Sequence, residues 1–142
     1  TVDETTLPAQ GADARGFFGG GAWAPDFDNA ASRAFVAAFD ERYGYIPGVY
    51  AMFGYDTAML LDSAVAAVAG DLSDTDAFAA AVAAADFTSL RGDFRFGNNH
   101  FPVQDFYLLE VEERADGRFQ TTIAERVFED DADAYHQDCG ME

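Results

Sequence analysis

The sequence predicts an α/β fold in which three helices pack against a sheet that ends in a β-hairpin. Three consecutive segments between about residues 29 and 87 repeat apolar side chains at helical spacing. After Phe87 the apolar period changes to two, and Ala115–Gly117 carries a hairpin turn signal. One strand-like segment precedes the helices. This order of strand, helices and strand-rich region is typical of helices packed on a sheet.

The chain begins with a polar stretch, residues 1–14, for which we expect irregular structure. "GFFGGGAW" (16–23) then predicts a short buried strand that runs into a Gly-rich bend. Its glycines match neither a dinucleotide-binding fingerprint nor a P-loop, because no apolar helix start and no Gly-Lys-Ser/Thr sequence follows them.

The first predicted helix extends from Asp28 or Asn29, either of which can cap it, to Gly44. Phe35, Phe39 and Tyr43 recur every four residues and therefore form one apolar stripe.

The second predicted helix covers about residues 49–69, after Pro47. It is apolar over most of its surface, so we expect it to be largely buried. A third helix follows in "LSDTDAFAAAVAAADF", where Ser73 and Asp76 resemble a capping box.

The C-terminal part predicts strands. Residues 94–96 and 106–111 read as two strands joined by an Asn-Asn-His-Phe-Pro turn, and residues 119–123 alternate on a returning strand. The acidic stretch from Glu129 onward predicts a frayed tail or a surface helix.

Composition excludes several classes of function. The 142 residues suit one domain or part of a larger one, and 49% hydrophobic content allows a packed core. The net charge of −18 disfavours nucleic acid and anionic membrane surfaces as partners. All eight basic residues are Arg, and a single cysteine, Cys139, can form neither an internal disulfide nor a thiolate metal site.

Catalytic and metal-binding motifs are missing from the sequence. His100 has no partners at metal-ligand spacing, the acidic residues do not follow an EF-hand pattern, and no G-x-S-x-G motif occurs. We therefore expect no catalytic residue, no metal and no cofactor. No signal peptide or membrane span is visible, and because the chain does not begin with Met we expect its N-terminus to have been processed or cut.

Three motifs in order carry a family resemblance. "FVAAFDERYGYIP" (35–47), "GYDTAMLLDSA" (54–64) and "RGDFRFGNNHFPVQDFYLLEV" (91–111) resemble the C-terminal part of type I periplasmic binding proteins, in the branched-chain amino acid (Leu/Ile/Val) group of ABC importer subunits. The resemblance extends from about residue 12 to 139. It implies a two-lobed receptor that clamps a ligand between its lobes.

The resemblance also implies what the chain contributes. Residues 1–142 would be mostly second lobe, the helix at about 49–69 would cross over to the first lobe, and the first lobe itself would be absent. The implied partners are a small ligand (an amino acid, an aromatic acid or another carboxylate) and ABC permease subunits. The implied location is periplasmic or extracellular, including a membrane-associated lipoprotein.

Tyr55 is the first candidate ligand-binding residue, because the family places an aromatic side chain here against the ligand. It also lies near the start of a helix, where free backbone N–H groups favour anions; ordinary core packing is the alternative. Asp56 is a candidate too, although a first-turn acid that complements the helix dipole is the simpler interpretation. Trp23, the only Trp, is expected either to line the cleft or to pack on a helix.

Arg15 and Gly16 are the remaining candidates. Amino acid binders of the family usually have Glu before this Gly, where it pairs with the ligand ammonium. An Arg forks onto a carboxylate instead, which favours a carboxylate ligand. The alternative is that Arg15 is an ordinary surface residue.

Two other functions stay open at this stage. A small acidic α/β hydrolase would need two carboxyl groups with raised pKa values in one pocket. A ligand-sensing regulatory domain would use the same two-lobed fold. If the first lobe is absent, the apolar side of residues 60–68 should be exposed and should promote self-association.

Overall fold

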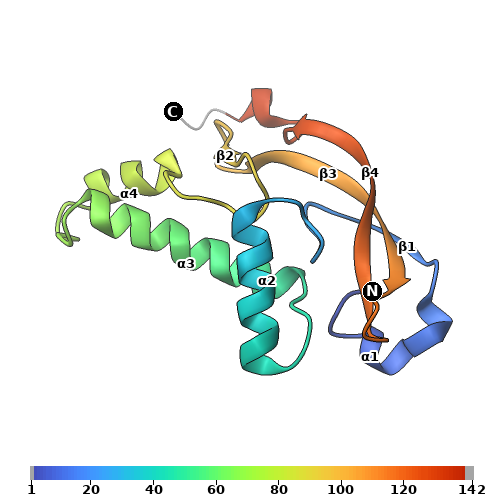
Figure 1. Cartoon of the computed structure of the whole chain (residues 1–142). Coiled ribbons are helices and arrows are strands. Elements are labelled where there is room, and N and C mark those ends of the chain that lie inside the picture. Colours follow the sequence, from blue (N-terminus) through green and yellow to red (C-terminus); the bar gives the residue numbers. More distant parts are fainter. Residues whose placement is uncertain (1, 140–142) are drawn as a thin grey trace.

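The computed structural model describes residues 2–139. Strands gather around the long β3 (Pro102–Glu113), and three helices, α2 (Ala30–Tyr43), α3 (Val49–Ala67) and α4 (Thr75–Ala84), extend to one side of them (Figure 1). The predicted α/β fold class is confirmed.

All strand pairs in the sheet are antiparallel and all involve β3. β1 (Phe18–Gly21) pairs with residues 107–110 of β3, β4 (Phe119–Asp131) pairs with β3 along most of its length, and β2 (Arg95–Phe96) pairs with its first two residues. The predicted hairpin turn is confirmed, since the Arg114 N–H donates to the Arg118 carbonyl at 2.8 Å.

The N-terminal stretch is more ordered than the sequence suggested. Residues 7–14 form a short helix, α1 (Leu7–Gln10), followed by the 3₁₀ helix η1 (Gly11–Ala14). Leu7 and Ala14 are buried against Val111 of β3. The prediction of irregular structure was therefore wrong, because two helices of four residues each are too short to show an apolar period.

β1 is a strand, as predicted, but it is not buried. Phe17 and Phe18 are 52% and 62% exposed. Among the described residues β1 pairs only with β3, so its other edge is open to solvent. Three successive glycines have no side chains with which to cover it.

The predicted bounds of α2 are confirmed. The Asn29 side chain accepts a hydrogen bond from the Ser32 N–H at 2.6 Å, and Gly44 ends the helix at φ 75°, a left-handed conformation that glycine adopts without strain. Beneath α2, Trp23 forms a core with Met52 and Leu90.

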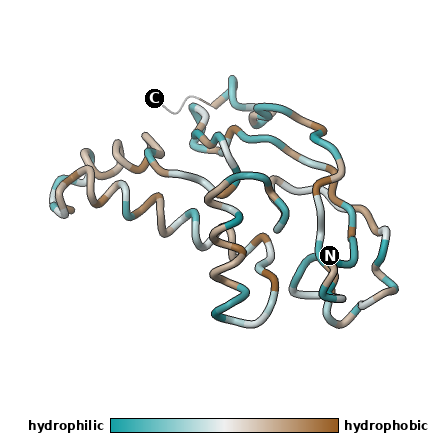
Figure 2. Tube along the Cα trace, in the orientation of Figure 1, coloured by the Kyte–Doolittle hydropathy of each residue, from teal (hydrophilic) through white to brown (hydrophobic). Residues whose placement is uncertain are grey.

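The bounds of α3 were also predicted, but its burial was not. Only Met52, Asp56 and Ala64 of this helix are buried, whereas Leu61 and Val65 are 45% and 36% exposed. Hydrophobic residues consequently lie on the surface of α3 and α4, which pack side by side away from the sheet (Figure 2). The prediction that this helix is largely buried was therefore wrong. The expected exposure of the apolar side of residues 60–68 is confirmed for Leu61 and Val65, whereas Ala64 is buried.

Two further details differ from expectation. Asp74, rather than a Ser73–Asp76 capping box, caps α4 by accepting from the Ala77 N–H at 3.0 Å, and Ser73 instead donates to Asp71. The acidic C-terminal stretch was predicted as a frayed tail or a surface helix, but its first residues belong to β4, which continues to Asp131. The short 3₁₀ helix η2 (His136–Asp138) follows. None of the helices within residues 2–139 is both long enough and apolar enough to cross a bilayer.

Candidate functional site

Two of the predicted site residues, Trp23 and Tyr55, are linked through an α2 side chain. The Phe35 ring lies 6.2 Å from the Trp23 ring and 4.9 Å from the Tyr55 ring, centroid to centroid. Trp23 is 2% exposed and its indole N–H donates to the Ser32 hydroxyl at 2.8 Å, so it packs beneath α2. Tyr55 is 40% exposed and presents part of its ring to solvent. Because α3 begins at Val49, Tyr55 and Asp56 lie beyond its first turn, and the prediction that they lie beside the free N–H groups of the helix start was wrong.

Asp56 lies in a buried polar network. Its Oδ1 accepts from the Leu90 N–H at 2.9 Å, and its Oδ2 accepts from the Ser89 hydroxyl at 2.6 Å and from Arg91 Nε at 3.0 Å. Arg91 also donates to Gln104 of β3 at 2.7 Å. The Asp56 carboxylate therefore ties α3 to the sheet, and every oxygen of it already has a protein donor.

Arg15 and Gly16 lie at the other end of β1, beside the β3–β4 hairpin. The Arg15 guanidinium contacts the Glu113 carboxylate, and both side chains are largely exposed. Gly16 adopts φ 76°, and its N–H donates to the Val111 carbonyl at 2.9 Å. The structure thus groups Tyr55 with Trp23 and Asp56 on the helical side, and it does not bring Arg15 or Gly16 to them.

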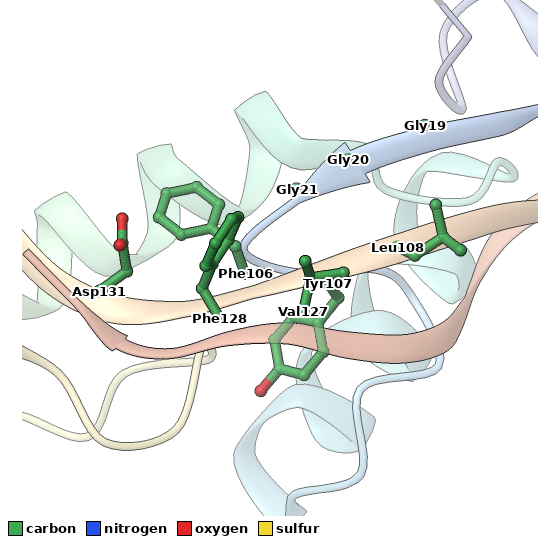
Figure 3. Close-up of a pocket in the computed structure, with 9 residues that line it drawn as sticks. All are labelled: Gly19, Gly20, Gly21, Phe106, Tyr107, Leu108, Val127, Phe128 and Asp131. Carbon is green, nitrogen blue, oxygen red and sulfur yellow. The ribbon is translucent and has the colours of Figure 1, made fainter.

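A glycine-lined pocket opens on the sheet (Figure 3). Its volume is about 380 Å³, and its lining combines the three glycines of β1 with apolar side chains of β3 and β4: Gly19, Gly20, Gly21, Phe106, Tyr107, Leu108, Val127, Phe128 and Asp131. The only ionisable groups there are Tyr107 and Asp131. Burial, with the neighbouring Asp105 carboxylate, raises the pKa of Tyr107 to about 12. The pocket therefore has room for an apolar group, but none of the residues that line it is a cation that could pair with a carboxylate.

A second concave surface contains Tyr55. We call it the aromatic groove; its volume is about 520 Å³ and it lies between α2 and α3, lined by Ala34, Phe35, Ala38, Phe39, Arg42, Tyr43 and Tyr55. The Phe39 ring lies 5.7 Å from the Phe35 ring and 4.6 Å from the Tyr43 ring, so the predicted apolar stripe of α2 is one continuous row of rings. This surface combines aromatic walls with a guanidinium.

Sequence reasoning missed the most exposed aromatic side chain of α3. Tyr50 lies in the first turn of the helix and is 73% exposed. Helix α3 begins after Gly48, which supplies no side-chain cap, so this ring lies at an uncapped helix end. The Gly-Val-Tyr sequence after Pro47 is the only signal that pointed to it, and such a signal is weak without the fold.

The carboxyl groups with raised pKa values do not form a catalytic pair. Burial raises the pKa of Glu4, whose Oε1 accepts from the N–H and the hydroxyl of Thr121, and burial raises the pKa of Asp26, which accepts from the Ile123 N–H. Both cap the outer edge of β4, and Asp26 lines none of the cavities described above. The hydrolase alternative gains no support from them. No cluster of three or more candidate metal ligands occurs among residues 2–139.

Comparison with known proteins places these features in a family. The sequence of residues 1–118 matches the periplasmic binding protein family. A solute-binding protein of an ABC transporter from R. palustris, solved in complex with benzoate, is 35% identical over 94% of the chain, with a TM-score of 0.84. No curated protein matches the chain.

Two further solved structures are similar. An ABC transporter substrate-binding protein from Sphaerobacter thermophilus is 31% identical over 92% of the chain, with a TM-score of 0.81. A solute-binding protein from Rhodopseudomonas palustris BisB5, in complex with 3,4-dihydroxybenzoic acid, is 27% identical over 93% of the chain, with a TM-score of 0.82. The chain spans only 35–36% of the length of these three proteins.

Proposed function

This chain belongs to the periplasmic binding protein family, as its sequence motifs predicted, and we propose that it is the C-terminal part of a receptor that delivers a small carboxylate to an ABC importer. The observation that carries the proposal is the 35% identity, over 94% of the chain, to a solute-binding protein that holds benzoate. The relative from Rhodopseudomonas palustris BisB5, which was solved with 3,4-dihydroxybenzoic acid, favours the same ligand class. An aromatic acid is therefore the ligand we propose.

The proposed receptor has two lobes. Residues 2–139 would belong mostly to the second lobe, to which they would supply the last strands and helices, and α3 would cross to a first lobe. The chain spans about a third of the length of its relatives. The hydrophobic side of α3 that is exposed here supports this arrangement, since a sheet or helix of the first lobe would cover it. The ligand would lie between the lobes, and permease subunits would dock on the closed receptor.

Among the candidate residues, Tyr55 receives the most support as a ligand contact. Its ring is partly exposed at a concave surface, whereas Trp23 and Asp56 are buried and already hydrogen-bonded. We propose that those two position the helices around the site. Arg15 and Gly16 would contribute only if the ligand or the first lobe displaces Glu113.

The family works outside the cytoplasm, and we propose a periplasmic or extracellular location for this receptor. A thermal-shift screen of the complete gene product against aromatic acids, amino acids and short aliphatic carboxylates tests the ligand class. Because a ligand that binds only the folded state raises the melting temperature, benzoates should raise it and leucine should not. A shift with amino acids alone would contradict the proposal.

The isolated chain should also self-associate. Leu61 and Val65 of α3 are exposed, and a second copy that covers them would remove apolar area from water. Light scattering should report a species larger than a monomer at micromolar concentrations, and Leu61→Glu should shift it toward monomer. A strictly monomeric wild-type chain would contradict this.

A further inference from the structure

The outer edge of β1 has no strand partner among the described residues. On its inner edge, the Val111 N–H donates to the Phe17 carbonyl at 2.9 Å. Because backbone groups alternate in direction along a strand, the N–H and C=O groups of Phe18 and Gly20 point to the outer edge. An unpaired edge is a template for another strand, and β1 carries none of the prolines or charged side chains that usually protect such an edge.

The glycine-lined pocket opens beside this edge. Figure 3 shows the side chains of Phe106, Phe128 and Asp131 on one side of the strands. Leu108 shares that side with Phe106, because side chains alternate along a strand, and Gly20 lies opposite Leu108 in the register. The pocket volume of about 380 Å³ exceeds the roughly 150 Å³ of a cavity that holds benzene. An aromatic side chain of an added strand, placed opposite Gly20, therefore fits into the pocket.

Three carboxylates near the pocket form no ion pair within the described part of the chain. Asp131 lines the pocket, and Glu110 lies opposite Phe18. Glu125 lies opposite Leu108. The described ion pairs all use other carboxylates. The Phe18 ring is 62% exposed beside Glu110, and the face of an aromatic ring attracts a cation. This surface therefore favours a partner with positive charges on either side of an apolar group.

We propose that the outer edge of β1 and the glycine-lined pocket bind an extended basic segment of a partner protein, which adds to the sheet as an antiparallel strand. An aromatic side chain opposite Gly20 enters the pocket. The basic residue two positions before it reaches Asp131, and the one two positions after it lies over Phe18 and reaches Glu110. The recognised pattern is thus basic-x-aromatic-x-basic.

Charge decides between this partner and a second copy of the chain. A second copy also carries a net charge of −18 and is repelled, whereas a basic segment is attracted. Neither Tyr55 nor a carboxylate ligand takes part in this contact. The inference therefore goes beyond the receptor function proposed above and does not depend on it.

The test is fluorescence anisotropy of a labelled Lys-Thr-Phe-Thr-Lys peptide titrated with the 142-residue chain. The peptide should bind saturably. Gly20→Leu should weaken binding roughly tenfold or more, because the new side chain takes the place of the peptide ring in the pocket. A Cβ at Gly20 would meet only the Tyr107 carbonyl, at 3.9 Å, so the chain accommodates it. Gly19→Leu is the matched control and should bind as wild type, because its side chain enters open space on the opposite side of the sheet.

Two further arms test the backbone pairing and the charges. A peptide with an N-methylated Phe keeps its ring and both charges but loses the N–H that faces Gly20, so it should bind roughly tenfold more weakly. Glu110→Gln combined with Asp131→Asn should weaken binding on the order of fivefold and should reduce its dependence on salt. Asp62→Asn, which removes an exposed acid from α3, is the control for the charge change and should bind as wild type.

Several results would overturn the proposal. They are an absence of peptide binding by the wild-type chain, equal losses in Gly20→Leu and Gly19→Leu, or equal binding of a Glu-Thr-Phe-Thr-Glu peptide. A dimer of the wild-type chain that Gly20→Leu dissociates would also overturn it, because the edge would then belong to a second copy. Circular dichroism should show unchanged secondary structure in each variant, so that a loss of binding reports the surface and not the fold.

Discussion

Asp56→Ala should destabilise the chain more than removal of any exposed acid. The side chains of Asp56 and Arg91 are 3% and 7% exposed, and the carboxylate accepts three hydrogen bonds from residues 89–91. The substitution leaves a buried guanidinium without its counter-charge, and such losses cost about 3–5 kcal/mol. For a domain whose total stability is of the order of 5–15 kcal/mol, that is a large fraction.

Urea denaturation followed by circular dichroism measures this free energy. Asp62→Ala, which removes an exposed acid from the same helix, is the matched control and should leave the free energy of unfolding nearly unchanged. The double variant Asp56→Leu/Arg91→Met should recover much of the loss, because it removes both buried charges together. A loss below about 1 kcal/mol for Asp56→Ala would refute the reasoning that this network ties α3 to the sheet.

Three further outcomes follow from the structure. Burial raises the pKa of Glu4 above its ordinary value of 4.5, so the wild-type protein loses stability as the pH rises and this carboxyl group ionises. Glu4→Gln does not ionise and should therefore become more stable relative to wild type as the pH rises. A constant difference in melting temperature between about pH 4 and 7 would contradict this. Asp74→Ala should cost about 1 kcal/mol in urea denaturation by removing the α4 cap, and Ser73→Ala should cost less; equal costs would favour the capping box. Added salt should raise the melting temperature, since it screens the repulsion within a chain of net charge −18, and a melting temperature independent of salt would exclude that repulsion as a main term.

The elements were predictable where local signals are long. The aromatic repeat and the Asn29 and Gly44 caps fixed the bounds of α2, and the apolar alternation with the hairpin turn predicted β3 and β4. Burial was harder, because it depends on which partner covers an apolar face. Helix α3 is apolar enough for a core, yet its Leu61 and Val65 are exposed, and the apolar pattern of a helix does not report which of its faces another element covers.

The candidate site could be predicted only in part. Tyr55 was identified from a motif, and it lies at a concave surface. Asp56 was interpreted as a dipole-complementing acid, whereas it pairs with Arg91, 35 residues away in sequence. The pairing of Asp40 with Arg118, 78 residues further along the chain, was invisible in the sequence as well. Pairings over such separations are set by the tertiary fold.

Isothermal titration calorimetry of the complete gene product with benzoate, with leucine as comparator, tests the central claim most directly. The account predicts saturable binding of benzoate with a dissociation constant at least a hundredfold below that of leucine, a difference of about 2.7 kcal/mol. Leucine binding more tightly than benzoate, or no heat of binding from any aromatic acid, would contradict it.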